Sequence, residues 1–497
     1  MYWDFSEMLK LFSYADKSRL LAEGKFGIEK ESQRITSSGD LALTPHPSVF
    51  GDKIENSRIT TDFSESQIEM ITPPFTSVEE AYNSLEQIRM EVDNSIKNEL
   101  LWPFSMPPRL PEEESIPIAR FSGTKEGRDK ETYRNGLALR YGKKMQMISG
   151  IHYNFSFREE MIDYLYERFG NGNVKRTFID SMYFALTRNF LRYRWMIIYL
   201  FGASPFYDST YNSVICKELK IIQKCCPDCC DIVEDINQYA TSLRVSRFGY
   251  SNTLHRKYAV YFDSLEEYTW KLQKMMATKH LKYKKLGLHR NGVQTQLNNN
   301  VLQKESEFYS SIRPKQIVKK GETQLEAMAK RGVGYIEVRI LDLNPFEKLG
   351  ISVEQLYFLQ VFMLFCLFEQ SDFITAGELD KINTNHHLVA LYGRKENLML
   401  HKYGKGVIEL KDLGGQIFEK LRCIAELMDK GSRADKYQQS VEKEYQKLMD
   451  KSLLLSERMQ REMKENNESF LEFGTRQATN NSQKILQEEF NYGYGGI

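Results

Sequence analysis

The sequence predicts an α+β protein in which helices cover one face of a β-sheet while the other face lines a polar cavity. Several short stretches alternate apolar and polar residues with a period of two, which is typical of strands. In each stretch the polar face carries acids, amides, His or Arg. Longer segments with helical periodicity separate these stretches. A single polar strand face is commonly exposed to solvent, but four or five in one chain favour a shared cavity.

The composition is that of an ordinary globular protein. The chain has 497 residues, of which 41% are hydrophobic and 27% are charged, and this length is sufficient for a large buried core. The 68 Lys and Arg residues nearly balance the 67 Asp and Glu residues. The basic excess typical of nucleic-acid-binding proteins is missing, so we expect no nucleic-acid partner, although a local basic pocket for a phosphate ligand stays open.

We also expect a cytoplasmic protein without a membrane partner. The N-terminus is amphipathic and carries acids early, unlike the basic and apolar regions of a secretory signal. The most apolar run, Leu356–Phe368, contains Gln360 and is shorter than the roughly 20 residues that cross a bilayer. It is therefore predicted to be a buried helix.

The N-terminal region begins with a helix over residues 4–22, because its apolar residues share one helical face. The period then changes to two in Lys25–Thr36, so this segment is predicted to be a strand that carries Glu29 and Glu31 on one face. Taken alone, these two acids are equally consistent with a solvated strand face.

A second extended segment, Ile59–Pro74, places three carboxylates among apolar and hydroxyl-bearing residues. Burying a carboxylate in such surroundings is costly unless it is paired or binds a metal. Asp62 and Glu69 are therefore candidate cation ligands, whereas Glu65 has no role in the site and is predicted to be structural.

Further along the chain, Ser77 and Glu80 form a capping box that begins a helix over 78–100. Trp102–Pro117 is rich in Pro and acids and is predicted to be a surface connection. The other predicted helices are 131–142, 158–170, 174–199, 264–286, 352–371, 413–429 and 435–465, followed by a polar tail over 466–497. The other predicted strands are Met145–Phe157, Gln294–Val301 and Tyr335–Asp342, and Tyr239–Asn252 is predicted to mix loop and strand.

The polar strand faces together predict a cation site. Their candidate ligands are Glu29, Glu31, Asp62, Glu69, His152, Asn154 and Glu337. Oxygen-rich ligands with one imidazole suit Mg²⁺ or Mn²⁺ better than Zn²⁺. Arg134, Arg244 and Arg339 add positive charge, and arginines beside such cations suit phosphoryl transfer. The chain has no Walker-type or dinucleotide-binding glycine motif, so a nucleotide would be held by metals and the sheet.

The chain resembles a known family through a series of motifs in one order: GIEKESQRI, ITTDFSESQIEMITP, WPFSMP, YRNGL-x-x-RYG, MQMISGIHYNFSF, YLFGASP, YATSLR, NVLQ-x-E-x-E-x-Y-x-x-IRPK and YIEVR-x-LD-x-NPF. These motifs are similar to those of bacterial glutamate–cysteine ligases of the proteobacterial type, which belong to the glutamine synthetase-like carboxylate–amine ligases. The resemblance covers about residues 20–430 and is weak beyond them.

The resemblance implies a curved, mostly antiparallel sheet with helices packed on its outer face. It implies a catalytic domain over 1–430 and a charged helical extension over 431–497 in the same unit. ATP would phosphorylate the γ-carboxylate of L-glutamate, and the amine of L-cysteine would attack the γ-glutamyl phosphate. The product, γ-glutamylcysteine, is the first intermediate of glutathione biosynthesis. Two to three Mg²⁺ or Mn²⁺ ions would assist, and we expect a monomer.

The resemblance also implies roles for individual residues. The metal ligands would be Glu29, Glu31, Asp62, Glu69, His152 and Glu337. Arg339 would steady the transferring phosphoryl group, with Arg134 near the phosphates. Arg244 and Asn154 would bind glutamate. The cysteine pocket would comprise Tyr133, Leu137, Gln146, Tyr250, Tyr309 and Phe63.

Two other functions stay open: a carboxylate–amine ligase with a different amine acceptor, because a pocket for a small side chain discriminates weakly, and a non-catalytic binding protein on the same fold. Some relatives continue into an ATP-grasp domain that adds glycine. This chain ends at Ile497, so we expect only the first step.

The segment Lys224–Asp231, KCCPDCCD, has four cysteines in six residues and departs from the family pattern. It is consistent with a surface loop of reduced thiols, with a redox pair such as Cys226 and Cys229, or with a metal site, although no second cysteine cluster exists to complete one.

The redox hypothesis predicts that mild oxidation changes the enzyme's activity as the thiols are lost, because a disulfide would constrain this segment. Activity and thiol titre measured before and after oxidation test it. Unchanged activity with complete thiol oxidation would rule the switch out.

Overall fold

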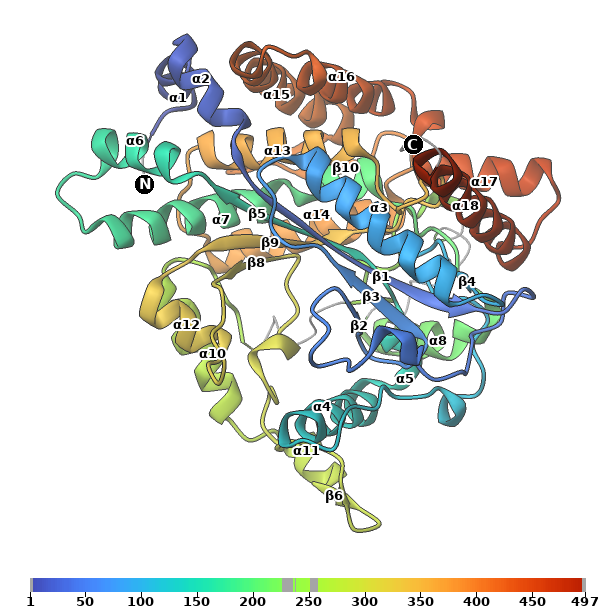
Figure 1. Cartoon of the computed structure of the whole chain (residues 1–497). Coiled ribbons are helices and arrows are strands. Elements are labelled where there is room, and N and C mark those ends of the chain that lie inside the picture. Colours follow the sequence, from blue (N-terminus) through green and yellow to red (C-terminus); the bar gives the residue numbers. More distant parts are fainter. Residues whose placement is uncertain (1–2, 226–235, 237, 251–257, 494–497) are drawn as a thin grey trace.

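A seven-stranded sheet runs through the middle of the protein in the computed structural model, which describes residues 3–225, 236, 238–250 and 258–493 (Figure 1). The strands lie in the order β2-β3-β1-β5-β9-β8, with β4 beside β1, and every pair is antiparallel. Their bounds are β1 (Gly24–Ile35), β2 (Ile59–Thr61), β3 (Gln67–Ile71), β4 (Leu100–Leu101), β5 (Ile151–Phe157), β8 (Ile312–Lys315) and β9 (Tyr335–Leu341). The predicted α+β class with an antiparallel sheet is confirmed.

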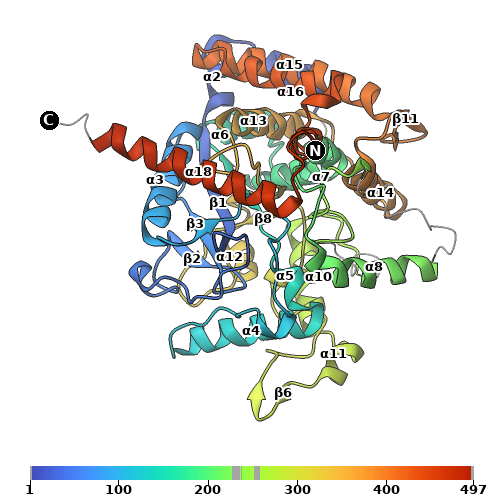
Figure 2. The same cartoon turned by 90° about the vertical axis from the view of Figure 1, so that its right-hand side faces the viewer.

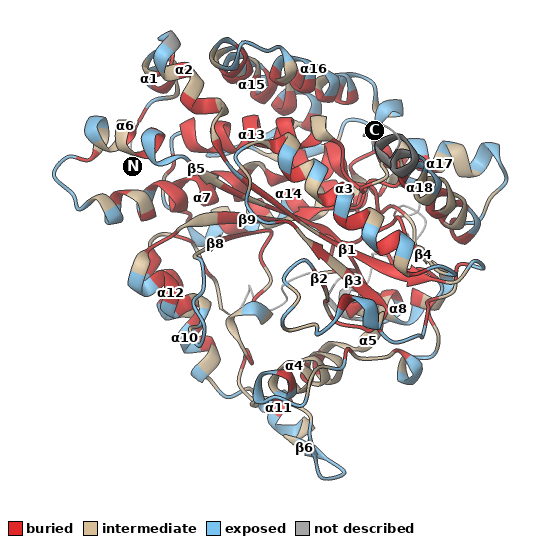
Figure 3. Ribbon diagram, in the orientation of Figure 1, coloured by how far each residue is buried: buried red, intermediate tan, exposed pale blue. Residues whose placement is uncertain are grey.

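Helices cover the apolar face of this sheet. Helix α7 (Lys175–Phe201) contacts β8 and β9, and α3 (Val78–Ser95) contacts β1 and β3. Behind them lies α13 (Val353–Phe368), whose residues from Gln355 onward are all buried; it appears red in Figure 3. The predicted buried helix is thus confirmed. No helix in the described part of the chain has the length and hydrophobicity needed to cross a bilayer.

The C-terminal helices complete the outer layer. Helices α15 (Leu410–Ser432) and α16 (Lys436–Met449) pack on α13 and lie above the sheet in Figure 1, whereas α4 (Lys125–Tyr141) and α11 (Leu281–Leu286) lie below it. Most of α4 is only partly buried (Figure 3). The polar face of the sheet is therefore covered less tightly than the apolar face.

Several predicted elements are divided by polar side chains that bind the backbone. The helix over 4–22 is two helices, α1 (Phe5–Leu11) and α2 (Ala15–Ala22), because the Ser13 hydroxyl donates to the Lys10 carbonyl at 2.8 Å. Residues 264–286 form α10 (Leu265–Ala277) and then α11. Residues 435–465 form α16 and α17 (Leu455–Glu465), with Asp450 accepting from the Ser452 amide between them.

The predicted extended segment Ile59–Pro74 is a hairpin, β2 and β3, with Asp62 and Ser64 in its connection. The Ser64 hydroxyl donates to the Pro117 carbonyl at 2.7 Å and accepts from the Ser66 amide at 3.2 Å. These bonds to neighbouring backbone turn the chain back on itself. The hairpin matters for function because it brings Asp62 close to β3.

The predicted strand Gln294–Val301 was wrong beyond its first residue. Val293–Gln294 (β7) pairs with β6 (His289–Arg290), and Asn300 forms only an isolated bridge with Lys279. The residues between them bind an arginine, because the Arg140 guanidinium donates to Gln296 Oε1 at 2.9 Å and to the main-chain carbonyl of Asn298 at 2.7 Å. The described part of Tyr239–Asn252 contains no strand, only a bridge between Ser204 and Ser242.

The predicted strand Met145–Phe157 was correct only over β5, because Met145 and Gln146 lie in a helix. The predicted helix over 78–100 ends at Ser95, and Leu100 lies in β4. The remaining helices and strands follow the predictions or had no prediction. Helices α6 (Glu159–Phe169) and α7 match their predicted ranges, and α3 begins with the predicted capping box. Sequence patterns did not indicate α5 (Lys143–Gln146), α8 (Asn212–Cys225), α12 (Gln324–Arg331), α14 (Ala376–Tyr392), β8, or the pair β10 (Met399–His401) and β11 (Val407–Glu409). Cys226 and Cys229 lie outside the described residues.

The prediction of a surface connection over Trp102–Pro117 was wrong for its first half, and the prediction of a polar C-terminal tail was wrong. Residues 102–108 are buried, and most of the tail forms α18 (Phe470–Gly493), which packs on α3 and β4 (Figure 2). Gly474 allows this approach, because a Cβ there would lie 2.0 Å from the Trp102 ring. The aromatic ring of Phe470 meets Trp102 edge-on at 5.6 Å. The tail therefore closes part of the core.

Replacing Trp102 with Ala should lower the free energy of unfolding by about 3–5 kcal/mol, because Trp102 is 0% exposed and its loss leaves a cavity under α18. Trp270, which is 52% exposed, provides the control; Trp270→Ala should change stability by less than about 1 kcal/mol. Chemical denaturation measures both. Similar effects of the two substitutions would contradict the assigned packing.

Candidate active site

A cavity of about 390 Å³ lies over the polar face of the sheet, between its strands and α4. Apart from Asn154, every residue predicted to bind metals, phosphate or substrate lines it. These residues are Glu29, Glu31, Asp62, Phe63, Glu69, Tyr133, Arg134, Leu137, Gln146, His152, Arg244, Tyr250, Tyr309, Glu337 and Arg339. They come from positions as far apart as 29 and 339, so the fold and not the local chain assembles them.

The strand register brings the polar residues together. Glu29 on β1 is opposite His152 on β5, and Glu31 is opposite Glu69 on β3. Glu337 on β9 faces Asn154 across the next pair. Because side chains at alternate positions of a strand share one face, Glu29, Glu31, Glu69, His152 and Glu337 all line the cavity.

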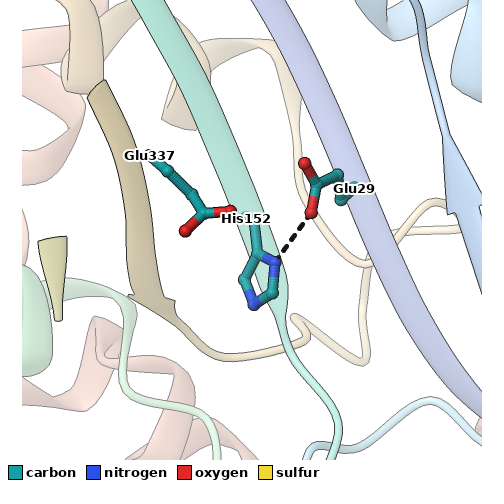
Figure 4. Close-up of side chains that lie close together, drawn as sticks. All are labelled: Glu29, His152 and Glu337. Atoms are coloured by element: carbon teal, nitrogen blue, oxygen red, sulfur yellow. Dashed lines mark hydrogen bonds and ion pairs between the residues drawn. The ribbon is translucent and has the colours of Figure 1, made fainter. Parts of the chain in front are cut away.

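Glu29, His152 and Glu337 form the first cluster of this cavity (Figure 4). Each offers one ligand atom, and these atoms lie within 4.8 Å of one another. His152 Nδ1 and Glu29 Oε2 are 3.0 Å apart. Burial and the nearby Arg339 guanidinium lower the pKa of His152, which favours the neutral imidazole that binds metals.

Basic side chains surround the Glu337 end of this cluster. Lys315 Nζ lies 3.2 Å from Glu337 Oε1, and an Arg339 guanidinium nitrogen lies 3.1 Å from Oε2. Burial by itself would raise the pKa of Glu337, but Lys315 and Arg339 hold it well below its usual range. Glu337 is therefore a carboxylate even without a metal.

Glu31, Glu69 and Asp62 form the second cluster, at the β2–β3 end of the cavity. Burial and the Asp62 carboxylate raise the pKa of Glu31 to about 8. Burial and the surrounding carboxylates raise the pKa of Glu69 well above its usual range. The three acids therefore repel one another, and a bound cation would relieve that repulsion.

The donor set of the two clusters fits hard divalent cations. It consists of carboxylate oxygens and one imidazole, which suit Mg²⁺ or Mn²⁺. The raised pKa values of Glu31 and Glu69 show that the protein alone provides too little positive charge at that end of the cavity.

Asn154 lies beside the cavity without lining it. Its Nδ2 donates to Glu29 Oε1 at 2.8 Å, so its amide orients a candidate ligand. Its predicted contact with glutamate stays a prediction. Glu65, predicted to be structural, points away from the cavity, where its carboxylate accepts from Lys53 Nζ at 2.6 Å and from the His46 amide at 2.7 Å.

Two arginines extend the cavity with positive charge. Arg244 lies against Gly150, where a Cβ would approach within 2.0 Å, and donates to the Arg339 carbonyl at 2.9 Å. Its Nε is buried and has no hydrogen-bond partner among the described residues. Arg134 donates to the carbonyls of Asp62 and Thr61 and lies 4.6 Å from the centre of the Phe121 ring. Arg244, which lies 3.8 Å from Asp342 Oδ1, thus keeps a buried donor without an acceptor among the described residues, as does Arg339 at its Nε.

The wall opposite the sheet is more apolar and consists of α4, α5 and two loops. Tyr133 and Leu137 belong to α4, and the Tyr250 and Tyr309 rings stack with centroids 5.6 Å apart. A buried ion pair fixes this wall, because the Arg140 guanidinium donates to Glu307 Oε1 at 2.9 Å.

Sequence reasoning missed six residues that line the cavity: Tyr141, Met145, Ser306, Glu307, Arg313 and Lys315. The motif with IRPK contained a usable signal, because Arg313 and Lys315 alternate with Ile312 and Pro314 in a short strand. Glu307 could not be placed from sequence, since its partner is 167 residues away.

Comparison with known proteins gives consistent results. The glutamate–cysteine ligase family profile matches residues 9–389. A glutamate–cysteine ligase of Clostridium acetobutylicum is 63% identical over 475 residues, which is 95% of this chain and 99% of that protein. One of Pseudomonas paraeruginosa is 40% identical, over 97% and 90%. The crystal structure of glutamate–cysteine ligase from Francisella tularensis with AMP has a TM-score of 0.83 and 34% identity, over 93% and 89%.

Replacing Glu69 with Gln should separate metal binding from folding. In EDTA at pH 8 the variant should unfold at or a few degrees above the wild-type temperature, because a repelling carboxylate is gone. The rise in unfolding temperature that Mg²⁺ gives the wild type should shrink. Because Glu31 and Glu69 have folded pKa values above their unfolded ones, metal-free wild type should lose stability as pH rises from 6 towards 8.

The control is Glu65→Gln, which removes a carboxylate that is bound by Lys53 and should destabilise the protein equally with and without Mg²⁺. Thermal unfolding followed by circular dichroism measures the wild type and both variants, each in EDTA and in Mg²⁺. A Glu69→Gln variant that is destabilised in EDTA but keeps the full Mg²⁺ response would contradict the assigned cluster.

Proposed function

Because the chain belongs to the glutamate–cysteine ligase family and joins L-glutamate to L-cysteine with ATP, we propose that the cavity over the sheet is its active site. The observation that supports this most strongly is the pair of acidic clusters beside Arg339 and Lys315 in one buried cavity. Such an arrangement suits phosphoryl transfer, in which catalysis consists mainly of positioning and charge neutralisation.

We propose that the two clusters hold two to three Mg²⁺ or Mn²⁺ ions. Their ligands would be Glu29, Glu31, Asp62, Glu69, His152 and Glu337. When bound, these ions supply the positive charge that brings the phosphates of ATP beside the acceptor carboxylate. Asn154 contributes indirectly, because its amide fixes the orientation of Glu29.

The basic residues act on the transferring group. In the first step a γ-carboxylate oxygen of glutamate attacks the γ-phosphorus of ATP, the bond to the bridging oxygen breaks, and ADP leaves. Arg339 and Lys315 reach the cavity from adjacent strands and donate to the phosphoryl oxygens, while Arg134 approaches from α4. Arg244, whose buried Nε has no hydrogen-bond partner among the described residues, binds a glutamate carboxylate.

In the second step the neutral amine of cysteine attacks the acyl carbon of γ-glutamyl phosphate. The bond from this carbon to the phosphate oxygen breaks, phosphate leaves, and the nitrogen loses a proton. The more apolar wall holds the thiol side chain. Its residues are Phe63, Tyr133, Leu137, Gln146, Tyr250 and Tyr309.

The protein is proposed to work as a cytoplasmic monomer. Apart from Asn154, every residue proposed to bind metals, phosphate or substrate lines this one cavity, which supports a site that is complete within a single chain. ATP and free amino acids are available in the cytoplasm. Helices α16 and α18 pack on α13 and α3, which supports a single unit that includes residues 431–497.

A coupled assay of ADP release should show turnover that requires glutamate and cysteine together. Arg339→Ala should lower kcat by about 10³-fold or more, because arginines that stabilise a phosphoryl group contribute on that scale. Arg58→Ala, which replaces an exposed arginine, is the control and should leave kcat unchanged.

Turnover with another amine but not with cysteine would indicate a different acceptor. No turnover with any amine would indicate a binding protein. Product analysis by mass spectrometry identifies the dipeptide.

A further inference from the structure

A second cavity of about 650 Å³ lies behind the apolar wall of the active site. Helices α7 and α14 and the segments 245–250 and 309–311 surround it. The two cavities share Tyr250 and Tyr309, which line both of them. The second cavity contains none of the acidic groups proposed to bind metals, so its chemistry differs from that of the active site.

Arg194 of α7 is the distinctive residue of this cavity. Only 8% of it is exposed. Its guanidinium donates to the Ser311 hydroxyl at 2.9 Å and to Asn383 Oδ1 at 2.7 Å, and both acceptors are neutral. Its buried Nε has no hydrogen-bond partner, and no carboxylate lies within ion-pair distance of it among the described residues. Burial lowers the pKa of Arg194 to about 10, so it stays charged at neutral pH.

A neighbouring buried arginine is compensated by an acid. Arg192 on the same helix lies 2.6 Å from Glu378 Oε1. A buried charge without an opposite charge costs several kcal/mol. Arg194 therefore reduces stability unless an anion occupies the cavity beside it.

The remaining walls indicate the kind of anion. Arg247 adds a second positive charge, whereas Val245, Leu379 and Leu388 provide apolar surface. Asp380, on the exposed side of α14, is the acid that lines the cavity. One buried guanidinium beside apolar surface suits a monoanion with a short hydrocarbon body, because a carboxylate matches the two parallel donors of Arg.

We propose that the second cavity binds a small carboxylate through Arg194, and that its occupancy alters the amine-acceptor pocket through Tyr250 and Tyr309. The effect on the amine-acceptor pocket rests on the function proposed for the first cavity. The two rings stack at an interplanar angle of 23°, and each forms part of both walls. A ligand that displaces either ring would therefore change the affinity for the acceptor amine.

Thermal unfolding of the full chain tests binding, with sodium propionate as the probe and sodium chloride at equal ionic strength as the reference. Propionate should raise the wild-type unfolding temperature by about 2–4 °C in a saturable way. The rise should persist in saturating L-glutamate, which separates this site from the active site.

Two variants decide whether Arg194 is the receptor. Arg194→Met should abolish the propionate response without lowering the unfolding temperature, because it removes an uncompensated charge. Arg192→Met is the matched control, because it removes an arginine of the same helix that is paired with Glu378 and should lower the unfolding temperature while the response persists. A wild-type response no larger than that to chloride, a response kept in Arg194→Met, or an Arg194→Met variant as destabilised as Arg192→Met would overturn the proposal.

The ligase assay tests the coupling separately. Propionate should change the KM for cysteine at least twofold in the wild type and leave it unchanged in Arg194→Met. Binding with an unchanged KM would overturn the coupling alone. Should the protein release no ADP with any amine, the proposed function would fail while the unfolding experiments would still decide whether the second site exists.

Discussion

The antiparallel register that places Glu29 opposite His152 and Glu31 opposite Glu69 is the constraint on which the rest of the site depends. Side chains of a strand alternate between two faces, so a slip of one residue would turn these groups into the core and their apolar neighbours into the cavity. The packing of α3 and α7 on the apolar face prevents such a slip. The same burial that stabilises the fold thus holds the acids in place.

Charge is distributed unevenly along the cavity. At the β8–β9 end, Lys315 and Arg339 already neutralise Glu337. At the β2–β3 end, no Lys or Arg of the described residues forms an ion pair with Glu31 or Glu69, and their pKa values rise. The proposed combination of a polyanionic substrate with divalent cations complements this pattern, because the cations would offset the carboxylates and the basic residues would offset the phosphates. The apolar wall with Tyr250 and Tyr309 completes the cavity for a small side chain.

Much of the site followed from sequence because periodicity is local information. Alternation in Met145–Phe157 and Tyr335–Asp342 correctly placed His152 and Glu337 on polar faces. The same reasoning failed for Gln294–Val301, where the Gln296 side chain and the Asn298 main-chain carbonyl bind Arg140 instead of forming a strand. It also missed Lys315, because β8 has only four residues and gives a weaker alternation signal than the longer strands. For Asn154 the prediction was partly successful: its position on the polar face of β5 was predicted, but its hydrogen bond to Glu29 was not.

The sequence by itself determined the fold class, the family and the residues of the polar strand faces, because these depend on neighbours along the chain. Only the tertiary structure decided which charges meet. It paired Arg140 with Glu307, buried Trp102 beneath α18 and placed Arg194 beside a second cavity without an ion-pair partner in the described part of the chain. The physical reason is that such pairings join elements far apart in sequence, and their energies depend on distances and burial that exist only after the helices have packed on the sheet.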